Sequence, residues 1–428
     1  MYKFEKIKSI KSVGPCRTYD LTVADDHSFI ANQIIAHNSS SRKPNFQNQP
    51  SRGPFAKLVK RQYIAGKGEI YIKNDYNAAE VRQWANLSQD TKLASTFRTG
   101  MVMRKELFLE EDPDKKEALK QKIKGEGDVH RLNYSFFFGK NPKDVTDEER
   151  TSVKSVIFGV MYGKSSYTLA EDLKCSEKEA QALLEKLFAT YKAGGDWIKR
   201  TQANGHKHLT VSSPIGRVRH LAGVLHQNLA VVSGNERRMC NSVTQGFSSD
   251  MGYQGGRMLQ QVVYKLFQKQ GYPLHLAENN TVHDSVEAVT KFEHLPLSLY
   301  LVEQAFTTLV QHKYKKTFGL NWVIESEMDS EVGCTIGTTK KLDWYDLPNL
   351  VRSELEWSST ELGYDYSEEE KAEILRKFDH NYALMTKVRK FETKKYLEFV
   401  QENPTEVYID CLLLQPERLE KVRSNLLF

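Results

Sequence analysis

Apolar residues recur at helical spacing over two long stretches of the chain, and these stretches, residues 176–204 and 235–270, predict long helices. A pair of short apolar segments around residues 273–289 predicts a β-hairpin. The dense mixture of charges at residues 104–124 is typical of a solvated helix. The chain is therefore expected to have an α+β fold in which helices are the majority.

The two ends of the chain differ from this body. Residues 18–38 alternate apolar and polar side chains as two short strands around Asp25-Asp26, which predicts a small all-β unit. Residues 367–400 have the aliphatic and aromatic spacing of two helices, and Pro404 and Pro416 break the pattern in the remaining residues. We divide the chain into three parts: residues 1–38, a body of residues 39–348, and a helical C-terminal extension of residues 349–428.

Charge is unevenly distributed over the 428 residues, whose net charge is +6. Residues 1–38 contribute five basic and four acidic groups, and residues 349–428 contribute twelve basic and sixteen acidic groups. The body therefore carries +9, which suits contact with a phosphate backbone.

The composition also excludes several classes of protein. No apolar run approaches the roughly 18 residues of a membrane span, and the N-terminus has no apolar signal-peptide core, so we expect no membrane partner and a cytoplasmic location. The five cysteines lie far apart without C-x-x-C spacing, which argues against a disulfide framework or a zinc site.

The residues around Asn38 have the chemistry needed to cleave the chain. An Asn amide can attack its own backbone carbonyl and form a succinimide if a neighbour helps to protonate the leaving group, and His37 is suited to that role. The hydroxyl of Ser39 can accept an acyl group in a transesterification. Together, Tyr-Asp-Leu-Thr-Val, Asp-His-Ser-Phe and His-Asn-Ser resemble the C-terminal blocks of inteins.

This resemblance implies that Asn38 cyclises with the assistance of His37. His27 and Asp20 would be upstream polar helpers, and Ser39 would be the first extein residue and the branch nucleophile. A start Met followed by only 37 intein residues implies a split intein whose other half is a separate polypeptide. We therefore expect splicing in trans.

Two aspartates stand where divalent cations could be held. Ile70 and Ile72 predict a strand that ends at Asp75, and the predicted hairpin places His283-Asp284 in its tight turn. Nucleotidyl transfer uses two divalent cations about 3.5–4 Å apart, and Mg²⁺ prefers a few carboxylates together with water and phosphate oxygens. The pattern therefore predicts a site for two Mg²⁺ ions, or Mn²⁺ in their place, although each aspartate alone is more often a turn residue.

One stripe of a predicted helix combines cations with aromatic rings. Its residues step by four and so form one nearly straight face: Arg150, Lys154, Phe158 and Tyr162. The cations can hold a triphosphate, and the rings can stack on a sugar and a base. A plain amphipathic helix does not normally place Arg and Lys on the same stripe as Phe and Tyr, so we interpret this face as nucleotide-binding.

These motifs resemble those of family A DNA polymerases, the bacterial polymerase I and phage replicase group. The matching segments follow the family order over roughly residues 39–340: SSSRKPNFQNQP, DYNAAEVR (motif A), GDVHRLNYSFFFG, the R-x3-K-x3-F-G-x2-Y-G of motif B, GRVRH, ERRMCNSVTQG and VHDS (motif C). The resemblance implies a right-hand polymerase with a palm and helix-rich fingers in residues 39–348.

The resemblance also implies roles in the chemistry. Asp75 and Asp284 would hold the two metals. Three residues would bind the incoming triphosphate: Lys154, Arg150 and His130. Lys154 is also placed to protonate the leaving pyrophosphate.

Further roles concern the sugar, the base and the DNA. Glu80 would be the steric gate against a ribose 2′-hydroxyl, Phe158 would pack on the sugar, and Tyr162 would stack at the templating position. Seven residues would line the primer-template backbone and minor groove: Asn45, Gln47, Asn48, Arg237, Asn241, Gln245 and His283. Contacts in the minor groove sense pairing geometry without reading sequence.

The chain departs from the family pattern at three positions. Ser285 stands where motif C usually has Glu, so a secondary carboxylate is missing. Ala78 and Ala79 stand where motif A usually has a Gln and a bulky aliphatic residue. We expect a looser pocket floor beside Glu80 and weakened sugar discrimination or fidelity.

The function predicted is the C-terminal part of a DNA-directed DNA polymerase that extends a primer with dNTPs by two-metal nucleotidyl transfer. Its partners would be primer-template DNA, dNTPs and the N-terminal polymerase and intein fragment on a separate chain, with activity only after splicing or association. The alternatives are a single-subunit RNA polymerase-like enzyme, which Glu80 and PNFQNQP disfavour, and a non-catalytic DNA-binding or splicing remnant. A phage origin would place the protein in the bacterial host cytoplasm.

The role of residues 349–428 is left open by these motifs. We expect a solvated helical appendage, with a docking site for a replisome partner as the alternative.

Overall fold

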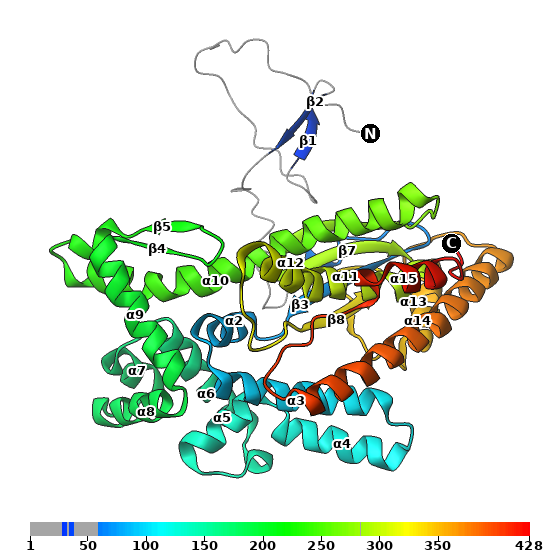
Figure 1. The fold of residues 1–428 in the computed structure, drawn as a ribbon. Helices are drawn as coiled ribbons and strands as arrows, with labels where there is room; N and C mark the ends of the chain where they lie inside the picture. Colours follow the sequence, from blue (N-terminus) through cyan, green and yellow to red (C-terminus); the bar gives the residue numbers. More distant parts are fainter. Residues whose placement is uncertain (1–27, 32–33, 38–58, 283) are drawn as a thin grey trace, which may run out of the picture.

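The computed structural model describes residues 28–31, 34–37, 59–282 and 284–428. Its centre is a five-stranded antiparallel sheet in the order β6-β7-β3-β8-β9 (Figure 1). The strands are β3 (Glu69–Tyr76), β6 (Leu276–Val282), β7 (Ser285–Lys291), β8 (Met328–Gly333) and β9 (Lys340–Lys341). The central strand β3 therefore pairs with two strands made more than 200 residues later.

The alternation of side chains along β3 separates a buried face from an open one. Ile70 and Ile72 are fully buried, in a core shared with α10 and α11, whereas Lys73 and Asp75 point to the opposite face. This confirms the predicted strand, which ends at Tyr76, one residue after Asp75. The hairpin predicted around residues 273–289 is also confirmed, because β6 and β7 flank the turn that holds Asp284.

A group of helices lies on one side of the sheet and has its own core (Figure 1). Its members are α2 (Ala79–Ser88), α3 (Thr91–Leu109), α4 (Pro113–Glu126), α5 (Val129–Phe138), α6 (Asp147–Met161), α7 (Ser166–Leu173), α8 (Glu177–Thr190) and α9 (Lys192–His208). Trp84 and Ile157 are completely buried in this second core. The predicted helix over 176–204 is two helices, because the chain changes direction at Tyr191, whose φ and ψ are −114° and 65°.

The helix predicted over 235–270 is confirmed as α10, which begins earlier, at Leu229. It extends to Val262 and continues as a π-helical turn (Val263–Phe267) and a 3₁₀ turn (Gln268–Gln270). In Figure 1 it connects the small hairpin of β4 (Thr210–Ser212) and β5 (Val218–His220) with the sheet. Two further helices follow β7 and cover the buried face of the sheet: α11 (Leu295–Phe306) and α12 (Thr308–Phe318).

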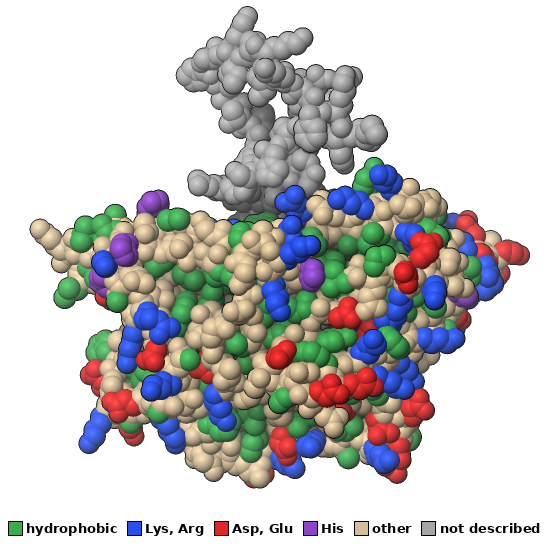
Figure 2. Space-filling view, in the orientation of Figure 1, with side chains coloured by type: hydrophobic (Ala, Val, Ile, Leu, Met, Phe, Trp, Pro, Cys, Tyr) green, Lys and Arg blue, Asp and Glu red, His purple; other side chains and the backbone are tan. Residues whose placement is uncertain are grey.

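The charged segment 104–124 falls on the end of α3 and on α4, which are separated by a break at which Asp112 caps α4. Gly125 is the one buried residue of α4, so the expectation of a solvated helix is confirmed there. Figure 2 shows acidic and basic side chains interspersed over this part of the surface.

The C-terminal extension differs from the expectation. Residues 367–400 lie in one continuous helix, α14 (Glu368–Glu402), instead of two. Its buried positions Phe378, Met385 and Val388 form one stripe against the core of the sheet, which favours a single uninterrupted helix.

Nor is this part of the chain a solvated appendage. Together with α14, α13 (Leu347–Thr360) and α15 (Pro416–Arg423) contribute Val351, Leu355 and Leu419 to the core that contains Ile70. The extension is therefore built into the same hydrophobic core as the central sheet.

At the N-terminal end, β1 (Ser28–Ala31) and β2 (Ile34–His37) form an antiparallel pair. Both described strands follow Asp25-Asp26, so the segment expected to form the second strand contains two strands. Asp25-Asp26 itself lies outside the described residues. Within the described ranges, no helix combines the length and the apolar character needed to cross a membrane.

Candidate active site

Two aspartates meet at one end of the central sheet. Asp75 is the penultimate residue of β3, and Asp284 lies in the turn between β6 and β7. The backbone N–H of Tyr76 donates to the carbonyl oxygen of Asp284 over 3.1 Å, which fixes the two chain segments side by side. The structure thus brings together the two carboxylates predicted to hold metals.

The electrostatics of this pair favour a cation. Burial, and then the negative charge of Asp284, raise the pKa of Asp75 to about 6, and Lys73 only partly opposes them. Two neighbouring carboxylates that repel each other supply hard oxygen ligands, the type that Mg²⁺ prefers. The donor chemistry of the site therefore fits the expected metal.

A cavity of about 350 Å³ opens above the aspartates. It is lined by residues from β3, α2, α3, α5, α6 and β8, including most of the predicted chemical groups: Asp75, Asp284, Glu80, His130, Arg150, Lys154 and Phe158. Residues spread over more than 200 positions of sequence therefore face one space.

Helix α6 presents its cationic stripe to this cavity. A capping box formed by Thr146 and Glu149 fixes the start of the helix. Arg150, Lys154 and Phe158 then line the cavity from successive turns, with the Lys154 Nζ 5.7 Å from the centre of the Phe158 ring. The predicted helical face is confirmed for these three residues, whereas Tyr162 caps the C-terminus of α6 and does not line the cavity.

Asp128 is a member of the site that the sequence motifs did not single out. Its carboxylate caps α5 by accepting the backbone N–H groups of His130 and Arg131, and it also accepts the Nε–H of Arg150 over 2.7 Å. An aspartate directly before the apolar helix VHRLNYSFFF is the usual N-cap signal, which would have located it. Asp128 orients two of the residues predicted to bind phosphates.

His130 is neutral over the physiological pH range. Burial lowers its pKa to about 4, against the opposing attraction of Asp128. Its Nδ1 atom is buried and has no hydrogen-bond partner among the described residues. A neutral imidazole beside Arg150 and Lys154 can donate one hydrogen bond without adding to the charge of the cavity.

Glu80 and Tyr162 are joined directly. The Tyr162 hydroxyl donates a hydrogen bond to the Glu80 carboxylate, so the end of α6 is tied to the first turn of α2. Burial raises the pKa of Glu80, and the bond from Tyr162 acts in the opposite direction. Tyr162 lies outside the set of cavity-lining residues, whereas Glu80 belongs to it.

Ala78 and Ala79 form part of the cavity wall beside Glu80. Ala78 has a φ of 50° and a ψ of 44°, a left-handed conformation that a non-glycine residue adopts at a cost of roughly 1 kcal/mol. It precedes α2 and lets the chain turn sharply from β3 into that helix. The looser pocket floor expected from the sequence stays a prediction.

A buried network of ion pairs and hydrogen bonds holds the turn between β3 and α2 in place. Arg82 is 1% exposed, and it donates to the carbonyl oxygens of Asn77 and Glu325 and to the Glu327 carboxylate. Arg104 binds the same carboxylate from α3. Burial alone would raise the pKa of Glu327, but Arg104 and Arg82 hold it below its usual value.

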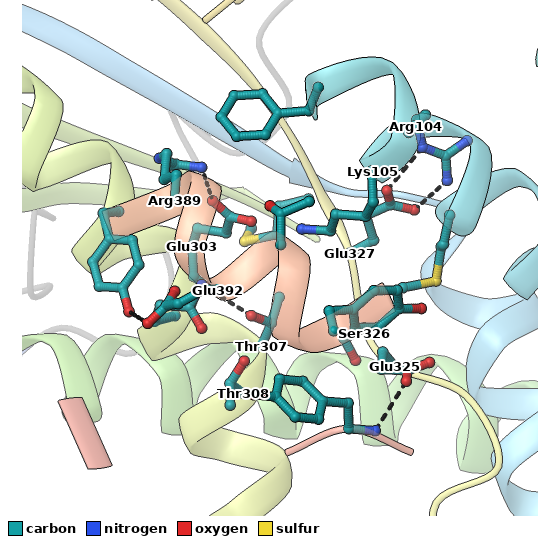
Figure 3. A pocket seen from close by; sticks show the side chains of 18 of the residues that line it. Arg104, Lys105, Glu303, Thr307, Thr308, Glu325, Ser326, Glu327, Arg389 and Glu392 are labelled. Atoms are coloured by element: carbon teal, nitrogen blue, oxygen red, sulfur yellow. Dashed lines mark hydrogen bonds and ion pairs between the residues drawn. The ribbon is translucent and has the colours of Figure 1, made fainter. Parts of the chain in front are cut away.

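A second cavity, of about 290 Å³, is lined by Arg104, Glu325 and Glu327 of the same network (Figure 3). Arg104 lines both cavities. The C-terminal extension supplies part of the second one: Arg389 pairs with Glu303 over 2.8 Å, and the backbone N–H of Tyr408 donates to Glu325 over 3.0 Å. The extension therefore contacts the residues that support the active-site turn.

The predicted DNA contacts are only partly within the described chain. Arg237, Asn241 and Gln245 step by four along α10, and Arg237 and Gln245 are exposed. None of the three lines the active-site cavity. Four other predicted contacts lie outside the described residues: Asn45, Gln47, Asn48 and His283.

The residues predicted for splicing also lie almost entirely outside the described chain: Asp20, His27, Asn38 and Ser39. His37 is the last residue of β2, and its backbone pairs with Ser28.

Comparison with known proteins shows which family the chain resembles. Residues 31–311 match the family model described as DNA polymerase family A. The chain is similar to DNA polymerase I of Caldicellulosiruptor bescii (26% identity over 306 residues, 69% of this chain and 31% of the relative). It is also similar to the thermostable DNA polymerase I of Thermus filiformis (29% identity over 212 residues, 50% of this chain and 22% of the relative).

The fold is similar to that of the POL domain of Pol1 from M. smegmatis, solved in complex with a DNA primer-template and dNTP. The TM-score is 0.55 at 23% identity, and the match covers 70% of this chain and 45% of that one. The chain spans less than a third of the length of the curated relatives named above. Because the family model covers well over half of its residues, the chain belongs to DNA polymerase family A.

Proposed function

We propose that this chain carries the nucleotidyl-transfer site of a DNA-directed DNA polymerase. The proposal rests on one observation: the Asp75 and Asp284 carboxylates and the Arg150 and Lys154 cations line the same cavity. A dNTP substrate brings phosphates, which bind cations, and metal ions, which bind carboxylates. The cavity offers both kinds of group. The curated relatives, which are named DNA polymerase I, support the same reading.

The triphosphate of an incoming dNTP is held by α6 and α5. Arg150, fixed by Asp128, and Lys154 bind phosphate oxygens, and neutral His130 donates a further hydrogen bond. Lys154 also supplies a proton to the departing pyrophosphate. These groups orient the nucleotide and offset the charge that develops on it.

Asp75 and Asp284 hold two divalent cations, Mg²⁺ or Mn²⁺. When bound, the ions lower the pKa of the primer 3′-hydroxyl and offset the negative charge on the reacting phosphate. The aspartates orient them from the sheet end, where Tyr76 fixes the spacing of the two segments.

The sugar is selected on the wall formed by α2. Glu80, held by Tyr162, excludes a ribose 2′-hydroxyl, and Phe158 packs against the sugar face. Arg237, Asn241 and Gln245 contact the DNA from α10, together with residues outside the described chain.

The test is single-nucleotide primer extension by the chain combined with its N-terminal partner. Asp284→Asn should abolish incorporation, because the charge that binds the metal is lost. The matched control is Asp365→Asn, which changes an exposed aspartate outside the cavity and should retain full activity. Comparison of dNTPs with rNTPs separates a DNA from an RNA polymerase. Equal extension by the Asp284→Asn protein would refute the proposal.

We also propose that residues 1–38 act in protein trans-splicing. The support is the pattern of His37, Asn38 and Ser39 after a predicted β-unit. Mixing the chain with an N-terminal precursor should give a larger ligated product and release a 38-residue fragment. Asn38→Ala should block the release, whereas Asn45→Ala should not. Ligation by the Asn38→Ala chain at an unchanged rate would contradict this role.

A further inference from the structure

The register of the central sheet places two residues on either side of Asp75. Ser285 of β7 is its direct partner on one side, and Asp329 of β8 is its direct partner on the other. Directly opposed residues of antiparallel strands project from the same face, with Cβ atoms about 4.5–5.5 Å apart. Ser285 occupies the position at which motif C of similar polymerases usually has Glu.

Asp329 faces the active-site cavity and is held in place there. It is one of the residues that line the cavity. The Asn77 side-chain amide donates to its Oδ2 over 3.0 Å. The backbone of Asn77 is in turn fixed by Glu327 and Arg82. The direction of the Asp329 carboxylate is therefore tied to the turn that follows Asp75.

The cations near this carboxylate neutralise it only partly. The Arg104 guanidinium interacts with it electrostatically but is hydrogen-bonded to Glu327. The ion-pair partner of Asp329, Lys341, lies 3.7 Å away and is 77% exposed, and such pairs contribute little. Like charges directly opposite each other on neighbouring strands are destabilising. Asp75 and Asp329 nevertheless face each other, with Asp284 at the same sheet end, an arrangement that a bound cation would stabilise.

We propose that Asp329 is the secondary carboxylate of the metal site. It supplies from β8 the negative charge that Glu would supply from β7, at the position where this chain has Ser285. This inference rests on the proposed function and names a further residue for it.

Asp329 acts as a positioning residue. In the described part of the chain, no three Asp, Glu, His or Cys side chains converge closely enough to be direct ligands of one ion. In this role Asp329 would act through water on the cation, accepting hydrogen bonds from it and adding negative charge to the site.

Glu331 provides a matched control on the same strand. It is two residues from Asp329, so it lies on the same face of β8 and carries the same charge. Its carboxylate is already paired with the Lys73 Nζ over 3.1 Å and accepts a bond from Thr339 over 2.7 Å. It does not line the cavity.

The experiment measures Mn²⁺ binding to the full chain by the electron paramagnetic resonance signal of free Mn²⁺. Asp329→Asn should weaken binding by about 10-fold, the lower end of the usual effect of an outer carboxylate. Glu331→Gln should change it by less than about twofold. Adding Ser285→Glu to Asp329→Asn should restore binding, because the new carboxylate approaches Asp75 from the opposite strand.

Two results would overturn the inference. In the first, Asp329→Asn binds Mn²⁺ like the native chain while Asp75→Asn binds it weakly. In the second, Glu331→Gln loses as much Mn²⁺ affinity as Asp329→Asn, and Ser285→Glu does not restore binding to the Asp329→Asn chain. Failure of the proposed function gives a different result, since Asp75→Asn would then leave Mn²⁺ binding unchanged. Restored binding in the double variant also shows that the Asp329→Asn chain is folded.

Discussion

The hydroxyl of Tyr162 donates a hydrogen bond to the carboxylate of Glu80 and so connects the end of α6 with the cavity wall formed by α2. In the proposed function, Glu80 excludes a 2′-hydroxyl, which requires its carboxylate to keep one position. That position therefore depends on a residue contributed by another helix.

Tyr162→Phe tests this dependence. A hydrogen bond to a charged group contributes about 1.5–3 kcal/mol, so its loss should lower the preference for dNTP over rNTP by at least roughly 10-fold. The measurement is the ratio of incorporation efficiencies for the two nucleotides. Tyr167→Phe removes the hydroxyl of a tyrosine that is 61% exposed and should leave the ratio unchanged. An unchanged ratio for Tyr162→Phe would show that Glu80 is held by other contacts.

The pH dependence of stability should reveal the repulsion at Asp75. Its pKa is about 6 in the folded protein and near 3.8 in the unfolded chain, so the folded state binds more protons between these values. Stability should therefore fall as the pH rises from about 4 to about 6 and remain lower above that.

Asp75→Asn removes the charge repulsion at this position and its effect on stability. In a chelating buffer it should raise the thermal midpoint at about pH 8, and the difference should vanish below about pH 4. Adding Mg²⁺ should raise the midpoint of the native chain more than that of the variant. A difference independent of pH would argue against the repulsion.

Arg82 should be among the most sensitive charged residues of the fold. Arg82→Met would leave Glu327 buried with Arg104 as its remaining cationic partner, and breaking a buried pair in this way costs about 3–5 kcal/mol. The control is Arg352→Met, which breaks an exposed pair with Asp379 and should cost less than about 1 kcal/mol. Urea denaturation measures both, and equal losses would contradict the central role of Arg82.

The C-terminal extension should be required for stability. Phe378 is completely buried in the core of the sheet, so Phe378→Ala should destabilise the chain by about 3–5 kcal/mol. Phe391 lies on the same helix but is 43% exposed, and Phe391→Ala should cost less than about 1 kcal/mol. Equal unfolding midpoints for the two variants would indicate that the extension is a surface appendage.

The features that the sequence predicted correctly are local ones. The apolar alternation before Asp75, the turn at Asp284 and the stripe from Arg150 to Tyr162 each depend on a few neighbouring residues. The resemblance to family A then indicated that these segments meet, and the cavity confirms this for Asp75, Asp284 and the first three residues of the stripe.

The features that were missed depend on contacts between distant segments. The register that sets Asp329 beside Asp75 is determined by strand pairing across the sheet, which no local pattern records. The continuity of α14 was missed for the same reason. Asn381, a weak helix former, is held by bonds to the backbone of Glu293 and Leu427, so tertiary contacts override its local preference.

The order of strands in the sheet has a consequence for synthesis of the chain. About 250 residues separate β3 from β8, so at about 5–20 residues per second a ribosome needs roughly 12 to 50 s to complete the strand that closes one side of β3. Ile70 and Ile72 cannot be buried until α10, β7 and α11 have been made, and the edge of β3 that pairs with β8 stays open to other chains for the whole interval. The central strand is thus exposed to unwanted pairing for much of translation, and the cavity that β8 helps to line can be completed only late.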